Sequence, residues 1–379
     1  MANNNKHTGP NVPALRFPEF SGEWLNSKLG SIAEFSKGTG ISKDQRSETG
    51  NPCILYGELY TRYKSEVIKN IISKTDLPDT DLVKSKSNDI IIPASGETAE
   101  DIATARCVPF DNILLGGDLN IIRLMNQDGR FFSYQLNGVR KYDVATVAQG
   151  VSVVHLHAGD LKGITVKYPA DIAEQRKISE MISIIDDRIE TQSKIIEEQE
   201  TLLKSLADKL ISSQVANVAL NDCVVAKAST MKESELELLG TFPVYGASGL
   251  CGYSNEALEK SNSLLVTKDG SGVGTCQYAT GNHSFLGTLC SLTAREGVYL
   301  PYIYYALLNF NFAAYKTGLA IPHIYFKDYG KASIFCPSYD EQVRIASGLE
   351  RLEAKISTDR ELLKQFHLQK GYLLSRMFI

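Results

Sequence analysis

The residues whose types and spacing most suggest a chemical function form a glycine-rich stretch, KDGSGVGTCQ, at residues 268–277. It follows the apolar run 264–266, as phosphate-binding loops follow a strand. A P-loop, however, ends in Gly-Lys-Ser/Thr, so that the lysine and the hydroxyl reach phosphate and magnesium. Here Gly274 is followed by Thr275 and Cys276, and the alternating glycines do not fit the dinucleotide-binding fingerprint. We interpret the stretch as a tight loop between two strands.

His155 and His157 are a second candidate, because side chains two residues apart on a strand point to the same side, as metal ligands do. A related stretch later in the chain has His323 but Tyr325, which breaks the pair. The sequence also contains no nuclease-like acidic cluster and no Asn-Pro-Pro-aromatic loop, with which amino-methyltransferases hold a flipped adenine. It therefore predicts neither a catalytic site nor a metal site.

The stretch that holds these histidines occurs twice. Residues 150–169 read GVSVVHLHAGDLKGITVKYP, and residues 318–337, 168 positions later (318 − 150), read GLAIPHIYFKDYGKASIFCP. Further landmarks recur in the same order: Tyr56-Gly57 with Tyr245-Gly246, Ile90–Ile92 with Leu264–Val266, Gly96 with Gly270, Gly116 with Gly287, and Glu174-Gln175 with Glu341-Gln342. Chance similarity between two β-rich segments is the alternative, but the similarity continues along the chain. The spacing of 168 positions is much longer than the period of solenoid repeats, which is roughly 20–50 residues. We therefore infer a duplicated domain.

A long helix is predicted after each copy, because apolar residues recur there at alternating steps of four and three, the heptad spacing of coiled coils. The predicted coiled-coil residues are Ile178, Ile182, Ile185, Ile189, Ile196, Leu203, Leu206 and Leu210 in the first helix, and Ile345, Leu349, Leu352, Ile356, Leu363, Phe366, Leu373 and Met377 in the second. Polar Gln192 and Asp359 take equivalent places in the two patterns. The alternative is that each helix packs only on its own domain. We expect the two helices to pair antiparallel.

The globular parts combine short apolar runs, broken by Gly, Asn, Asp and Pro, with short helices such as FSYQLNGVRKY (132–142) and YIYYALLNFNFAAY (302–315). We predict an α+β fold: two globular mixed α/β domains, joined and separated by two long helices that form an antiparallel coiled coil, with the copies related by a pseudo-twofold axis. The predicted segments are a loose leader at 1–20, domain 1 at 21–170, a first spacer helix at 171–215, domain 2 at 216–337, and a second spacer helix at 338–379.

Composition restricts the class of protein further. The chain has 379 residues, of which 43% are hydrophobic and 22% charged, and no run of about eighteen apolar residues, so we expect no membrane span. Seven dispersed cysteines without a signal peptide favour reduced thiols and a cytoplasmic protein. A formal net charge of −4 argues against a uniformly basic nucleic-acid binder, although a local basic face is still compatible with it.

The duplicated domain, with a long helix that begins near Glu-Gln after each copy, resembles the specificity subunit of a Type I restriction–modification system. The matching phrases are VPALRFPEF (12–20), Trp24 with KLGSI (28–32), YGELYTRY (56–63), the repeated G…H…D…P phrases, and the helix starts AEQRKI (173–178) and DEQVRI (340–345). The resemblance covers nearly the whole chain. It implies a non-catalytic DNA-binding subunit with two target-recognition domains that read an asymmetric bipartite site.

The resemblance also implies partners and cofactors. Double-stranded DNA and two methyltransferase (M) subunits would bind this chain, and restriction (R) subunits would join the complex. S-adenosylmethionine, ATP and Mg would be held by those partners, and none of them by this chain. The partners would also supply part of the surface that neutralises DNA phosphates, which makes the near-neutral charge of this chain tolerable.

The residues that we expect to contact DNA follow from position and side-chain chemistry. In domain 1 they are Tyr56, Arg62, Lys64, Ser95, Glu97, Thr98, Gln149, Ser152 and His155; in domain 2 they are Tyr245, Lys268, Asp269, Ser271, Lys316, Thr317 and His323. The acidic residues Glu97 and Asp269 would accept a hydrogen bond from cytosine N4 or orient a neighbouring base. An exposed loop residue without a partner is the alternative for each of them.

Two other classes of protein remain as alternatives at this point. The first is a coiled-coil scaffold whose globular ends bind protein. The second is a stand-alone methyltransferase, which the missing motifs disfavour.

Overall fold

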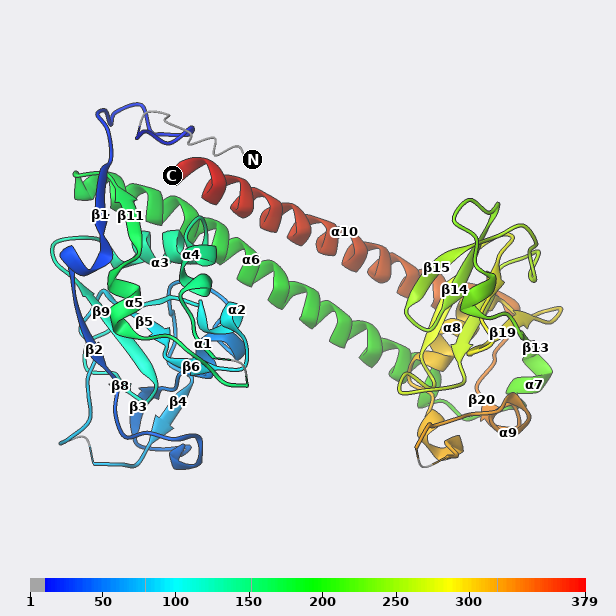
Figure 1. Cartoon of the computed structure of the whole chain (residues 1–379). Helices are drawn as coiled ribbons and strands as arrows, with labels where there is room; N and C mark the ends of the chain where they lie inside the picture. Colours follow the sequence, from blue (N-terminus) through cyan, green and yellow to red (C-terminus); the bar gives the residue numbers. More distant parts are fainter. Residues whose placement is uncertain (1–10, 79, 151, 319) are drawn as a thin grey trace. The chain divides into compact units, whose positions relative to one another are not determined.

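The computed structural model describes residues 11–78, 80–150, 152–318 and 320–379. It divides into two compact units, one holding the chain up to Gln192 together with Leu362–Ile379, and the other holding Ser193–Glu361. Unit 1 contains domain 1, and unit 2 contains domain 2. The two long helices pass through both units (Figure 1). Residues 1–10 of the predicted leader, and positions 79, 151 and 319, lie outside the described residues.

Domain 1 is built on a four-stranded antiparallel sheet of order β2-β9-β5-β7. In chain order these strands are β2 (Ala33–Lys37), β5 (Asp89–Pro93), β7 (Arg106–Val108) and β9 (Leu119–Leu124). The apolar run in β5 is fully buried because both faces of the sheet are covered. Ile90 and Ile92 pack with Phe131 and Phe132 in one core, and Ile91 packs in another, as the alternation of a strand requires.

Smaller elements complete domain 1. A second sheet of order β4-β3-β8 joins β3 (Asn51–Ile54), β4 (Ser73–Thr75) and β8 (Leu114–Leu115), while β1 (Leu25–Lys28) pairs with β11 (Thr165–Tyr168), and β6 (Ser95–Gly96) with β10 (Val154–His155). The short helices are α1 (Glu58–Thr61), α2 (Ala99–Ile102), α3 (Gly129–Asn137), α4 (Lys141–Thr146) and α5 (Ala158–Lys162). Because β1 pairs with β11, the start and the end of domain 1 lie side by side.

Domain 2 repeats this plan. Its four-stranded sheet has the order β13-β19-β16-β17, its second sheet the order β15-β14-β18, and β12 pairs with β20. The bounds are β12 (Val218–Ala219), β13 (Val224–Ala228), β14 (Phe242–Gly246), β15 (Gly249–Ser254), β16 (Ser263–Thr267), β17 (Cys276–Ala279), β18 (Ser284–Phe285), β19 (Leu289–Ala294) and β20 (Ser333–Ile334), with helices α7 (Leu220–Cys223), α8 (Leu300–Leu308) and α9 (Phe326–Tyr329). The expected short helices at 132–142 and 302–315 are thus present, and the duplication extends to strand order.

The hydrogen-bond registers refine the alignment of the two copies. Asn120 of β9 lies opposite position 92 of β5, and Cys290 of β19 lies opposite the equivalent position 266 of β16. The offset here is therefore 170 (290 − 120), so Gly287 corresponds to Gly117. The expected match of Gly287 with Gly116 is wrong by one residue, because letters alone cannot choose between two adjacent glycines.

Tyr56 and Tyr245 are not equivalent either. Ile54 of β3 lies opposite Leu115, and Tyr245 of β14 lies opposite Phe285, which is 170 positions later (285 − 115). Tyr245 therefore corresponds to Ile54, within a strand, whereas Tyr56 lies beyond the end of β3. The shared Tyr-Gly pair arises from different places in the two domains.

The spacer helices are α6 (Ile172–Ala207), which continues into a π-helical turn (Asp208–Ser212), and α10 (Tyr339–Met377). In unit 1 the start of α6 packs against the end of α10, where Lys370 contacts Asp186. In unit 2 the end of α6 packs against the start of α10, where Gln199 donates to Asp359 over 2.9 Å. The two helices therefore run antiparallel as a coiled coil, as expected. None of the helices in the described part of the chain is both long enough and apolar enough to pass through a bilayer.

Most of the predicted coiled-coil residues are buried. The buried ones are Ile178, Ile182, Ile185, Ile196, Leu203, Ile345, Leu349, Ile356, Leu373 and Met377, and the half-buried ones are Ile189, Leu206, Leu352, Leu363 and Phe366. Leu210 is the exception, with 39% of its surface exposed, while its neighbour Ile211 is buried. The prediction for Leu210 is wrong because the π-helical turn at 208–212 breaks the heptad spacing and brings Ile211 to the buried side.

The described part of the leader, residues 11–20, is not loose. The Arg16 guanidinium binds both carboxylate oxygens of Glu174 at 2.8 Å, and Glu174 also accepts a hydrogen bond from the Trp24 indole. The backbone N–H of Leu15 donates to the carbonyl of Arg376. The leader therefore covers the start of α6 and the end of α10, and Glu174 is buried because Arg16 supplies the compensating charge.

Candidate DNA-reading site

In domain 1, the segment after α4 contains β10, which pairs with β6, the strand that follows β5. His155 lies opposite Ser95 in the β10–β6 pair, and the N–H of Leu156 donates to the carbonyl of Ala94. His155 and Gln149 exchange two backbone hydrogen bonds, of 2.9 and 2.7 Å, which hold these two residues side by side. Three predicted contact residues, Ser95, Gln149 and His155, therefore meet at one place.

Domain 2 builds the same arrangement from different residues. His323 bridges Asp269, and the N–H of Ile324 donates to the carbonyl of Lys268. His323 and Thr317 exchange backbone hydrogen bonds of 2.9 and 2.8 Å. Gln149 thus corresponds to Thr317, and Ser95 to Asp269. We name this backbone arrangement, at 94–96 with 149–150 and 152–156, and at 268–270 with 317–318 and 320–324, the loop frame.

Glycine is required at the same point of each loop frame. Gly150 has φ of 129° and Gly318 has φ of 87°, both in the region that side chains disfavour. A Cβ atom at either position would also collide with a carbonyl oxygen, that of Val153 or of Ile321. The repeated glycine at the start of each copied phrase is therefore a requirement of the backbone.

The two loop frames present different side-chain groups. In domain 1 His155 is exposed and its ring stacks on that of His157, with centroids 6.3 Å apart, while Ser95 is buried and donates to Asp118. In domain 2 the Nδ1 atom of His323 lies 2.6 Å from a carboxylate oxygen of Asp269. Among the described residues, no three or more His, Cys, Asp or Glu side chains come together as a group that could hold a metal ion.

Apart from Ser152, the other predicted residues of domain 1 lie outside the loop frame. Thr98 accepts a hydrogen bond from the Asp101 N–H and thereby caps α2, while Glu97 and Ser152 are exposed. Arg62 forms an ion pair with Glu58 at 3.2 Å, and Lys64 is exposed.

Tyr60 lies beside the loop frame of domain 1, and the sequence analysis did not predict it. Burial, and then the nearby Tyr56, Asp101 and Glu97, raise the pKa of the Tyr60 hydroxyl. Its hydroxyl oxygen also lies 3.7 Å from the point where a Cβ on Gly96 would stand. The phrase YGELYTRY, in which Tyr60 follows Tyr56 by four residues, could have indicated Tyr60 as a further candidate.

The remaining predictions in domain 2 have mixed outcomes. Ser271 and Lys316 are exposed, and residues 268–275 form the expected tight loop between antiparallel strands β16 and β17. Tyr245, in contrast, lies in β14, where its ring contacts His283 and packs on the core around Phe285. No contact in the described residues joins Tyr245 to the loop frame of domain 2.

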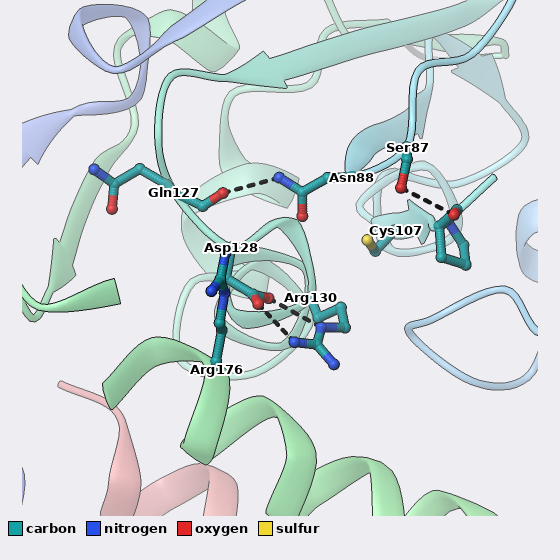
Figure 2. Close-up of a pocket in the computed structure, with 8 residues that line it drawn as sticks. Ser87, Asn88, Cys107, Gln127, Asp128, Arg130 and Arg176 are labelled. Atoms are coloured by element: carbon teal, nitrogen blue, oxygen red, sulfur yellow. Dashed lines mark hydrogen bonds and ion pairs between the residues drawn. The ribbon is translucent and has the colours of Figure 1, made fainter. Parts of the chain in front are cut away.

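A polar pocket of about 410 Å³ lies at the opposite end of β5 from the loop frame. Figure 2 shows Asn88, whose side chain donates to the backbone carbonyl of Gln127, and Arg130, which is paired with Asp128. Arg176, at the start of α6, also lines the pocket. It therefore sits where domain 1 meets its spacer helix.

Comparison with known proteins decides the family. The family model described as "Type I restriction modification DNA specificity domain" matches residues 21–201 and again residues 213–366. The chain belongs to this family. Each match covers one domain and part of the helix that follows it, which agrees with the duplication. This specificity-domain protein is therefore a DNA sequence-specificity subunit of the Type I restriction–modification class, a class that is generally non-catalytic.

Relatives agree with this assignment. A protein of Mycoplasma genitalium described as a type I specificity subunit is 22% identical over 285 residues, covering 69% of this chain and 73% of the relative. One of Mycoplasma pneumoniae, described likewise, is 24% identical over 253 residues, covering 57% and 67%.

Solved structures share the fold. The crystal structure of a Type I restriction–modification S subunit from M. genitalium has a TM-score of 0.68 at 18% identity and covers 97% of this chain and 99% of that one. A chain from a study of the complex assembly and conformational transition of the type I system has a TM-score of 0.56 at 13% identity, covering 94% and 97%.

Proposed function

We propose that this specificity subunit reads an asymmetric DNA site in two parts, one part with each domain, and positions methyltransferase subunits on it. The observation that carries the proposal is the loop frame, which has the same backbone hydrogen bonds in both domains but different side chains. A shared frame would set both loops against DNA in the same way. Different side chains would then select different bases, because base edges are distinguished by their donors and acceptors.

The side chains support a division of roles. Residues that carry donors and acceptors at the surface would contact bases, namely the exposed Gln149, His155 and Thr317 and the half-buried Lys268 and His323. The cations Arg62, Lys64 and Lys316 would contact phosphates, which position the protein without selecting a sequence. Asp269 would orient His323, and Ser95 would act through the backbone because its side chain is buried.

The chemistry would belong to partner proteins. Two methyltransferase subunits would carry S-adenosylmethionine and methylate adenine, and restriction subunits would supply ATP- and Mg-dependent cleavage. In support, the solved relative with a TM-score of 0.56 comes from work on assembly of a type I system. Co-expression of this chain with a methyltransferase subunit, followed by mapping of methylated adenines, is expected to yield one split, non-palindromic motif. A palindromic motif would contradict reading by two unlike domains.

Replacement of His323 by alanine is expected to lower methylation of that motif about tenfold, the loss that one base contact typically causes. The relaxation of sequence should be confined to one half of the motif. His155→Ala is the matched variant and should relax the other half instead. Methylation rates on single-base variants of the motif measure both effects, and relaxation of the same half by both variants would refute the assignment.

A further inference from the structure

Gln175, in the first turn of α6, joins three elements of unit 1. Its side-chain amide donates to the carbonyl of Pro169, just after β11, over 2.9 Å. Its side-chain oxygen accepts from the N–H of Asp128, the residue that caps α3, over 3.0 Å. The same amide also donates to the side chain of Gln127. Gln175 is fully buried, so every polar atom of this side chain has a partner inside the protein.

Gln342 makes the equivalent bonds in unit 2. Its amide donates to the carbonyl of Pro337 over 2.8 Å, and its oxygen accepts from the N–H of Tyr299, the cap position of α8, over 2.9 Å. Gln342 is 2% exposed. The partners that Gln342 uses are backbone groups, so this joint does not depend on the side chain at position 299.

A second bond joins the same helices farther along. In unit 1 the hydroxyl of Tyr134, on α3, donates to Asp186 of α6 over 2.7 Å. In unit 2 the hydroxyl of Tyr305, on α8, donates to Glu353 of α10 over 2.7 Å. Both tyrosines are buried. Burial and the adjacent carboxylates raise the pKa of both hydroxyls, so each tyrosine remains a neutral donor.

The spacing of the two bonds is the same in both copies. On the spacer helices they are eleven residues apart, from 175 to 186 and from 342 to 353, which is about three turns or 16 Å. On α3 and α8 they are six residues apart, from 128 to 134 and from 299 to 305. One attachment would allow the short helix to pivot on the long one, but two attachments fix its direction. We name these four bonds the two-point clamp.

Directional bonds explain why polar residues occupy these buried places. Apolar packing is non-directional and would tolerate small rotations of the domain on its helix. A buried amide that loses a partner leaves an unsatisfied group, which costs free energy, so rotation is opposed. The contact between α3 and α6 also includes apolar packing, with Phe131 and Ile178 in the same core, and a hydrogen bond of 3.3 Å from the Ser179 hydroxyl to Asp128.

We propose that the two-point clamp fixes the orientation of each domain on its spacer helix and thereby sets the number of base pairs allowed between the two halves of the DNA site. Gln175 and Gln342 act as positioning residues, since their polar atoms are occupied within the protein. This inference rests on the proposed function. It adds a determinant of spacer length that lies outside the loop frames.

The experiment uses the full chain in complex with its methyltransferase subunits. DNA substrates keep both half-sites of the mapped motif and vary only the spacer by one base pair in either direction. The variant combines Gln175→Leu with Tyr134→Phe, which removes both bonds in unit 1 while Asp186 keeps Lys370 as its partner. We expect the preference for the native spacer to fall about tenfold, equivalent to about 1.4 kcal/mol, while the bases read within each half-site stay the same.

Two further variants control for general loosening and for misfolding. Gln192→Leu makes the same substitution at a buried position of α6 that contacts neither Pro169 nor Asp128, and it should keep the native preference. In unit 2 Tyr304 also donates to Glu353, over 3.0 Å, so the matching variant combines Gln342→Leu with Tyr304→Phe and Tyr305→Phe. It should reproduce the relaxed preference from unit 2, even if the first variant folds poorly. An unchanged spacer preference in both clamp variants overturns the inference, as does equal relaxation in Gln192→Leu. Failure of the unmodified complex to methylate any split site overturns the proposed function instead.

Discussion

Replacement of Lys370 by methionine is expected to destabilise unit 1 by about 3–5 kcal/mol, the usual cost of removing one partner from a buried ion pair. The Lys370 Nζ atom lies 2.5 Å from Glu66 and 2.7 Å from Asp186, and only 14% of its side chain is exposed. Methionine would fill the space but leave two buried carboxylates without their cation. The penalty comes from those carboxylates, because transfer of an unpaired charge from water to the interior is costly.

The protonation state of Lys370 supports this expectation. Burial lowers the pKa of its ammonium group, but the attraction of Glu66 and Asp186, and the hydrogen bonds to them, outweigh burial and raise the pKa overall. A raised pKa contributes stability that is fully present below the unfolded value of about 10.4 and is lost as pH rises through the folded value. The contribution of Lys370 should therefore be constant at neutral pH and fade only in strongly alkaline solution.

Urea unfolding followed by tryptophan fluorescence measures this loss. Trp24 is the only tryptophan in the sequence and is buried in unit 1, so its fluorescence reports on that unit. Adding Glu66→Gln and Asp186→Asn to Lys370→Met should recover much of the stability, because the unpaired charges are gone. Lys141→Met, which removes an exposed pair with Glu100 in the same unit, should cost about 0–1 kcal/mol. A loss from Lys370→Met no larger than that from Lys141→Met would refute the prediction.

Exchange of residues 216–337 for the second domain of another family member is expected to change one half of the DNA motif and leave the other intact. Methylation of the original motif should fall about 1,000-fold or more, since each mismatched base pair costs about 1–3 kcal/mol and several would change together. The exchange is structurally possible because β12 pairs with β20, so the two ends of domain 2 are adjacent. Asn217 and Cys336 strengthen this junction with two hydrogen bonds, of 2.9 and 2.8 Å.

Mapping of methylated adenines before and after the exchange tests the prediction. The donor domain should keep a tyrosine at the position of Tyr305, so that its bond to Glu353 and the two-point clamp are retained. The reciprocal exchange of residues 21–170 is the matched control and should change only the other half of the motif. If either exchange altered both halves, the modular assignment would be wrong.

Several parts of the fold were predictable because they depend on short-range pattern. The heptad steps from Ile178 onward predicted a long helix, and burial of Ile178, Ile182 and Ile185 follows from that spacing. The prediction stopped being accurate where local geometry departs from the regular helix, at Leu210. The leader was misjudged because its composition is polar, although Arg16 is held by a carboxylate 158 residues away in the chain.

The candidate site was predictable in position but not in detail. The copied phrases placed His155 and His323 correctly at equivalent points, because the same backbone turn requires the same glycine. The sequence did not reveal that Asp269 holds His323, since these residues are 54 positions apart and meet only through β-bridging. The match of Tyr245 with Tyr56 was wrong because the same Tyr-Gly pair occurs at two positions that are not equivalent in the two domains.

The sequence by itself determined the duplication, the two spacer helices and the family resemblance, because the order of landmarks and the heptad period are properties of the chain read along its length. The tertiary structure alone decided which residues meet, namely the loop frames, the Lys370 ion cluster and the two-point clamp. Gln175 reaches Asp128 across 47 residues, and Lys370 reaches Glu66 across 304. Contacts of that separation depend on how sheets and helices pack, and no local pattern of side chains encodes them.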